Sequence, residues 1–88
     1  KTRPAVVISN EFINAHGKVV IVAPITSNAA KIYPCEHKII ANLKVEGKIM
    51  LDQMRSIDKS RVIKKLETLP QDEMCLVDEV IKHVTGIQ

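Results

Sequence analysis

Aromatic side chains are the scarcest class in this chain. Among its 88 residues there is no Trp, and Phe12 and Tyr33 make up the 2% aromatic content. Many proteins that bind single-stranded nucleic acid stack the bases on aromatic rings. With so few rings, any nucleic acid bound by this chain would be held mainly by charge and hydrogen bonds.

Long hydrophobic runs and glycine-rich loops are also missing. No apolar run is long enough to cross a bilayer, and the N-terminus lacks the basic, apolar and small-residue pattern of a secretion signal. We therefore expect a cytoplasmic protein that makes no membrane contact. The chain has only three Gly, and it contains no phosphate-cradling glycine loop, dinucleotide fingerprint or nucleophile elbow.

Cysteine and histidine are too few and too scattered to indicate a metal site. Cys35 and Cys75 lie far apart and outside any Cys-x-x-Cys spacing, so we interpret them as reduced packing residues. His16, His37 and His83 fall in a predicted loop, a strand and a helix end, which gives no support for a catalytic histidine pair. We expect no metal ion and no organic cofactor.

Positive charge is in small excess. Lys and Arg number 13 against 10 for Asp and Glu, giving a formal net charge of +3. This balance mildly favours a polyanionic partner. A chain of 88 residues forms one domain that buries a modest fraction of its surface, so a homodimer is a reasonable expectation.

The N-terminal half carries two short apolar runs that predict strands. Ala5–Ser9 and Lys18–Ala23 are rich in β-branched residues and predict a hairpin of buried strands joined by a loop. Pro24 is expected to end the second strand, and the polar segment that follows is expected to lie in a loop, which places Thr26 at a strand end.

The middle of the chain predicts shorter strands and turns. Glu36–Ile40 predicts a strand, and Glu46-Gly47 predicts a turn. In the run that follows, Ile49, Leu51 and Gln53 share one face if the chain is extended. Beyond it we expect a turn at 56–59 and a short strand at 62–66.

The C-terminal segment changes to a helical period after Pro70. Met74, Val77, Ile81 and Val84 recur at helical spacing. The ends match the preferences of a helix: Asp72 and Glu73 in the first turn, Lys82 and His83 in the last, and Gly86 beyond. Strands followed by one helix predict a mainly β fold, in which a small bent antiparallel sheet or barrel packs against a C-terminal α-helix.

Three motifs stand in a specific order and spacing along the chain. They are Arg3-Pro4-Ala5-Val6-Val7-Ile8-Ser9-Asn10, then Val22-Ala23-Pro24-Ile25-Thr26-Ser27, then Leu51-Asp52-Gln53-Met54-Arg55-Ser56-Ile57-Asp58. In this order the chain resembles the MazF/PemK family of toxins from Arg3 through the C-terminal helix.

The resemblance implies a fold, an activity and partners. The fold would be a small Src-homology-3-like barrel that forms homodimers. The activity would be sequence-specific, metal-independent cleavage of single-stranded mRNA by the toxin of a type II toxin–antitoxin system, held inactive by a cognate antitoxin. In the family a first strand and a Gly/Ser-rich loop precede the Arg-Pro motif. We therefore expect residues 1–88 to form a single toxin domain that lacks that strand and loop.

The resemblance also implies roles for individual residues. Arg3 and Thr26 would be the catalytic pair, because a guanidinium and a hydroxyl can stabilise charge that builds up on a phosphate. The residues implied to contact RNA are Ser27, Pro34, Glu36, Gln53 and Arg55. The proton acceptor stays open, because Arg is a poor general base; Glu36 and His37 are the candidates.

Other interpretations of these residues remain. Arg3 can be a solvated charge at a strand entrance, and Thr26 a loop residue that bonds its own backbone. Gln53 and Arg55 can equally serve a structural network. At the level of function, the same fold is similar to CcdB-type toxins, which bind DNA gyrase without catalysis. A silent binding module is a third possibility.

Overall fold

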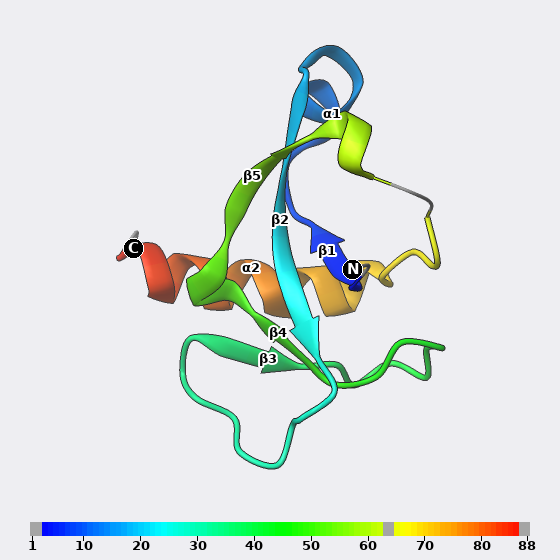
Figure 1. Ribbon diagram of the computed structural model, residues 1–88. Coiled ribbons are helices and arrows are strands. Elements are labelled where there is room, and N and C mark those ends of the chain that lie inside the picture. Colours follow the sequence, from blue (N-terminus) through cyan, green and yellow to red (C-terminus); the bar gives the residue numbers. More distant parts are fainter. Residues whose placement is uncertain (1–2, 63–64, 87–88) are drawn as a thin grey trace.

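The computed structural model describes residues 3–62 and 65–86 of the chain. The elements follow one another as β1 Ala5–Val7, α1 Glu11–His16, β2 Val19–Thr26, β3 Glu36–Lys38, β4 Lys48–Met50, the 3-10 turn η1 Leu51–Gln53, β5 Arg55–Asp58, the 3-10 turn η2 Lys59–Arg61 and α2 Gln71–Thr85 (Figure 1). Short strands followed by one long helix confirm the predicted fold class.

The long strand β2 is the centre of the sheet. Its first half, Val19–Val22, pairs with β5, and Ile25 and Thr26 pair with β4. β1 pairs antiparallel with β2 through Val6 and its neighbours, and β3 pairs antiparallel with β4. The sheet is antiparallel and barrel-like, although it does not close within the described residues.

Pro24 lies inside β2, so the expectation that it ends the strand is wrong. The register opposes Ala5 to Pro24, and the backbone bonds of the β1 pairing come from neighbouring positions, such as Ile25 N to Pro4 O at 3.2 Å. On the other side, pairing with β5 stops at Val22 and pairing with β4 starts at Ile25. Pro24 falls between these two pairings, where its missing N–H breaks no ladder bond.

Several other expectations for short segments are wrong. The expected loop after β1 contains helix α1, and the expected turn at 56–59 is mostly strand β5. Leu51 and Gln53 do not share a strand face, because η1 interrupts the chain: Leu51 is fully buried and Gln53 is exposed. Of the expected strand at 62–66, residues 62, 65 and 66 are not in a strand, and residues 63 and 64 lie outside the described residues.

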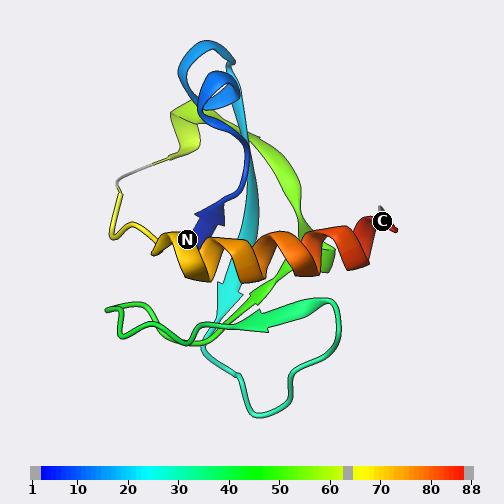
Figure 2. The same ribbon diagram turned by 180° about the vertical axis from the view of Figure 1, so that it is seen from behind.

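Helix α2 crosses β2 on one face of the sheet, as Figure 2 shows from behind. Val77 is fully buried against a core formed by Val6, Ala23, Ile49 and Leu51. The helix ends at Gly86, which has φ 76° and supplies the left-handed conformation of a helix C-terminus. The amphipathic stripe and the ends of this helix are confirmed.

Candidate active site

Arg3 and Thr26 line the same small pocket at the end of the sheet. Arg3 lies two residues before the start of β1, and Thr26 is the last residue of β2. The antiparallel pairing of the two strands brings these ends together. The pocket has a volume of about 250 Å³ and is lined by Arg3, Pro4, Ile25, Thr26, Ser27 and Glu46. Three residues of the predicted site, Arg3, Thr26 and Ser27, therefore meet in one place.

The Thr26 hydroxyl already takes part in a local turn. Its Oγ1 accepts a hydrogen bond from the backbone N–H of Asn28 at 3.3 Å. This contact matches the structural interpretation of Thr26 as a residue that caps its own loop. It uses one lone pair of the oxygen and leaves the hydroxyl proton available, so a ligand in the pocket can still receive a hydrogen bond.

Glu36 is committed to an ion pair beside this pocket. Lys48 lies opposite Thr26 in the strand register, and its Nζ donates to Glu36 Oε1 at 2.7 Å and to the carbonyl of Lys31 at 2.9 Å. The hydrogen bond from Lys48, together with one from the backbone N–H of Tyr33, lowers the pKa of Glu36. Glu36 is therefore a bound carboxylate that organises the loop before β3.

Tyr33 is an exposed ring between two cations in that loop. Its side chain is 48% exposed, with Lys31 Nζ 5.1 Å and Lys48 Nζ 5.3 Å from the ring centroid. Pro34 follows it and is also exposed. An exposed ring beside the exposed Lys31 suits a nucleic-acid base and its phosphate, whereas the Lys48 ammonium is engaged by Glu36. The low aromatic content gave no reason to select Tyr33 from the sequence.

Gln53 and Arg55 do not line the pocket that holds Arg3 and Thr26. Gln53 is exposed in η1, where its Nε2 contacts Met50 Sδ at 3.7 Å. Arg55 opens β5 opposite Val22, on the face of β2 that also carries Thr26, about 13 Å further along the strand at the usual rise per residue.

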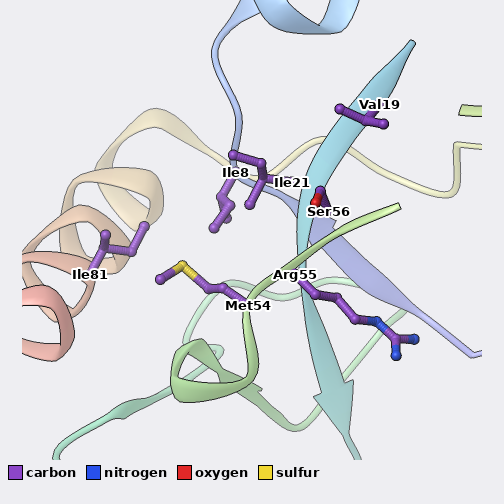
Figure 3. Close-up of a pocket in the computed structure, with 7 residues that line it drawn as sticks. All are labelled: Ile8, Val19, Ile21, Met54, Arg55, Ser56 and Ile81. Atoms are coloured by element: carbon purple, nitrogen blue, oxygen red, sulfur yellow. The ribbon is translucent and has the colours of Figure 1, made fainter. Parts of the chain in front are cut away.

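A second, apolar hollow lies beside Arg55. It has a volume of about 590 Å³, and its apolar lining comes mainly from Ile8, Ile21, Met54 and Ile81. Figure 3 shows these four side chains grouped together, whereas the Arg55 guanidinium extends away from them. Arg55 therefore lines the hollow as well, but its guanidinium is directed away from the apolar group.

The side chain of His37 lies on the opposite face of the paired strands β3 and β4 from those of Glu36 and Lys48. It is 9% exposed and forms a buried hydrogen-bonded pair with Glu73 of α2. The same carboxylate accepts from the backbone N–H of Ile40 at 3.1 Å and of Ala41 at 2.9 Å. His37 is therefore a structural residue that ties β3 to α2, and it does not reach the pocket as a proton acceptor.

The described residues offer neither a cluster of metal ligands nor a membrane-spanning helix. Within the described residues, no group of three or more His, Cys, Asp or Glu side chains is arranged to hold a metal ion. Across residues 3–62 and 65–86, no helix is both long and apolar enough to span a membrane.

Comparison with known proteins gives consistent matches. Residues 1–85 match the family described as PemK-like, MazF-like toxin of type II toxin-antitoxin system. The curated protein Endoribonuclease MazF9 of Mycobacterium tuberculosis is 36% identical to this chain. The alignment covers 91% of this chain and 75% of that protein.

Solved structures give the same answer for the fold. MazE-MazF (Form-III) from Deinococcus radiodurans matches with a TM-score of 0.85 and 33% identity, covering 98% of this chain and 87% of that one. An endoribonuclease in complex with its cognate antitoxin from Mycobacterial species matches with a TM-score of 0.90 at 16% identity, covering 100% and 84%. The gyrase-binding alternative is not favoured, and the chain belongs to the family of PemK-like, MazF-like toxins of type II toxin–antitoxin systems.

Proposed function

We propose that this MazF-family endoribonuclease toxin cleaves single-stranded mRNA at specific short sequences and needs no metal ion. The observation that carries the proposal is the pocket in which Arg3 and Thr26 meet with Ser27. Neither residue suggests catalysis when taken alone. Together they offer a phosphate a guanidinium and a hydroxyl, two donors that can stabilise charge on its oxygens.

The proposed chemistry is an internal transesterification. The ribose 2′-hydroxyl attacks the adjacent phosphorus, and the bond from phosphorus to the 5′-oxygen of the next nucleotide breaks. Arg3 presents a planar fork of N–H donors to the non-bridging phosphoryl oxygens, and the Thr26 hydroxyl donates to the same group. Donors held at this position stabilise the charge that develops in the transition state and orient the phosphate for in-line attack.

The RNA strand would continue from this pocket over the neighbouring polar surface. Ser27 and Pro34 belong to the loop after β2, and Tyr33 in that loop offers a ring on which a base can stack. Glu36 would act by holding the loop through Lys48. Gln53 and Arg55 would contact a more distant nucleotide or phosphate, because they lie outside the pocket of Arg3 and Thr26.

A protein antitoxin and a second copy of the chain are the proposed partners, and the cytoplasm is the proposed location. Similar solved structures include an endoribonuclease in complex with its cognate antitoxin and a MazE-MazF structure. With a net charge of +3, this chain suits an acidic, extended antitoxin segment that lies over the RNA-binding surface. The small size of the domain favours a homodimer.

The test is incubation of the full-length protein with a long single-stranded RNA in the presence of EDTA. The proposal expects discrete cuts that leave a 2′,3′-cyclic phosphate and a 5′-hydroxyl, and the aligned cut positions give the recognition sequence. Arg3→Ala in the same assay should remove the cuts while the helix content measured by circular dichroism stays unchanged. Intact RNA with a folded, full-length wild-type protein would refute the proposed activity.

A further inference from the structure

We propose that Glu46 is the general base of this endoribonuclease and accepts the proton of the attacking 2′-hydroxyl. This inference rests on the proposed function and supplies the proton acceptor that Arg3 and Thr26 do not provide. The pattern of the sequence marks Glu46-Gly47 only as a turn. The structure places Glu46 in the pocket that also contains Arg3 and Thr26.

The pocket contains few groups that can accept a proton. Its lining residues are Arg3, Pro4, Ile25, Thr26, Ser27 and Glu46. Arg3 carries a positive charge, two lining residues are apolar, and the hydroxyls of Thr26 and Ser27 are very weak bases. Glu46 is thus the lining residue whose side chain carries a carboxylate, a group that can act as a general base.

The backbone around Gly47 fixes Glu46 against the end of β2. Gly47 has φ +128°, and a Cβ built on it would lie 2.1 Å from the carbonyl oxygen of Thr26. Only glycine allows so close an approach between two backbone segments. The residue before it is therefore held next to Thr26, although the two residues are far apart in the sequence.

Two further contacts hold the same turn. The carbonyl of Gly47 accepts from the backbone N–H of Ile39 at 2.9 Å, and the N–H of Val45 donates to the Glu67 carboxylate at 3.0 Å. The backbone is thus anchored on both sides of Glu46. Its own side chain is exposed and can meet a substrate. A side chain on an anchored turn is better placed for proton transfer than one on a free loop.

The other acidic and imidazole candidates nearby are already occupied. Glu36 is paired with Lys48, and its pKa is lowered by the hydrogen bond from that ammonium group, which makes it a weaker base. His37 and Glu73 bond to each other on the side of the sheet that faces α2. Glu46 therefore takes the place of Glu36 and His37 as the candidate proton acceptor.

The proton balance of the step is complete. Glu46 removes the proton from the 2′-hydroxyl as the oxygen forms its bond to phosphorus, and Arg3 and Thr26 stabilise the charged phosphoryl group. The bond to the leaving 5′-oxygen breaks, and solvent water in the open pocket protonates that oxygen. Glu46 then returns its proton to solvent, so the enzyme is regenerated and the products are a cyclic phosphate and a 5′-hydroxyl.

A purely structural role for Glu46 predicts the opposite behaviour. A carboxylate beside an RNA phosphate repels it, so removing the charge would strengthen RNA binding and leave cleavage equal or faster. General-base catalysis requires cleavage to fall while binding is kept. The two roles therefore separate when binding and chemistry are measured independently.

The experiment compares full-length wild type, Glu46→Gln, Glu46→Asp and the control Glu79→Gln, an identical charge removal at an exposed position of α2. Single-turnover cleavage of an RNA containing the mapped site is followed across pH, and binding is measured with the same RNA carrying a 2′-deoxy sugar at that site. We expect Glu46→Gln to cleave about 10²- to 10⁴-fold more slowly and to bind equally or more tightly. Its rate should also lack the rise with pH that general-base catalysis predicts for the wild type.

The remaining variants make the result decisive. Glu46→Asp keeps the carboxylate and should retain part of the rate and the rise with pH, and Glu79→Gln should behave as wild type. Cleavage by Glu46→Gln within about threefold of wild type would overturn the role of Glu46 while the proposed function stands. Absence of cleavage by the wild type would overturn both.

Discussion

The Thr26 hydroxyl is the smallest group on which the proposed cleavage depends. Thr26→Val removes the hydroxyl and keeps the shape of the side chain, whereas Thr26→Ser keeps the hydroxyl. Because the donor to the transition state is lost, we expect Thr26→Val to slow single-turnover cleavage by about 10²-fold or more. Thr26→Ser should stay within about tenfold of the wild-type rate.

Stability provides the control for this pair of variants. Thr26→Val also removes the acceptor for the Asn28 N–H, which is worth about 1 kcal/mol in the free energy of unfolding. Urea denaturation should show a loss of this size in Thr26→Val and a smaller one in Thr26→Ser. Equal cleavage by the two variants would leave Thr26 with only its role in the turn.

The sequence predicts individual site residues with uneven success. The meeting of Arg3, Thr26 and Ser27 follows from family motifs whose strands pair in the fold. For Gln53, the alternation of side chains along an extended chain predicts a strand face. The structure differs because the backbone leaves the extended conformation in η1. The position of Glu46 depends on a backbone approach between distant segments, and no local pattern in the sequence encodes such an approach.

Among the elements, those with strong local patterns were predictable. The sequence predicts β1 and β2 from their apolar β-branched runs, and it predicts α2 from its apolar residues at helical spacing. Helix α1 has only six residues, and contacts between Ser9 and Asn14 support it, including Asn14 Nδ2 to the Ser9 carbonyl at 3.1 Å. β5 is polar and short, and it forms a strand because β2 pairs with it over four positions. Such tertiary pairing overrides local preference.

The contact between α2 and β3 predicts how stability depends on pH. Burial raises the pKa of Glu73, but hydrogen bonds from His37 and from the N–H groups of Ile40 and Ala41 outweigh it, so the pKa ends below its ordinary value of 4.5. A lowered pKa in the folded state stabilises the fold above pH 4.5. This contribution is lost as the pH falls through the folded-state pKa. We therefore expect the free energy of unfolding to decrease on acidification below pH 4.5.

Glu73→Gln tests the origin of this acid sensitivity. The variant should lose about 2 kcal/mol near neutral pH, because one amide oxygen replaces two charged acceptors for three donors. Its unfolding free energy, measured by urea denaturation between pH 3 and pH 7, should fall less steeply in acid than that of wild type. The Asp72 carboxylate accepts from the Glu73 N–H in the first turn of the same helix, so Asp72→Asn is the matched control. An unchanged acid dependence in Glu73→Gln would assign the effect to other groups.

At the scale of the whole molecule, the sheet formed by the described residues is open beside an apolar hollow. The apolar hollow of about 590 Å³ lies beside Ile8, Ile21 and Ile81, and within the described residues no strand covers it. An open apolar face of this kind suits an additional strand or a partner.

Charge determines how the whole molecule should bind RNA. The net charge is +3, and Arg3, Lys31 and Arg55 are exposed around or near the proposed RNA path. For single strands, each phosphate contact adds about −0.7 to the slope of log K against log salt concentration. If Arg55 binds a phosphate, Arg55→Gln should make this slope less steep by about 0.7 and weaken binding equally for all sequences.

The control for this measurement is Lys82→Gln, which removes one exposed charge from α2. Binding of an RNA that carries a 2′-deoxy sugar at the cleavage site is titrated at several salt concentrations for the wild type and both variants. Lys82→Gln should keep the wild-type slope. If Arg55→Gln keeps the slope and instead changes the preferred sequence, Arg55 contacts a base. If neither quantity changes, Arg55 lies outside the RNA path, which then runs through the loop of Tyr33 alone.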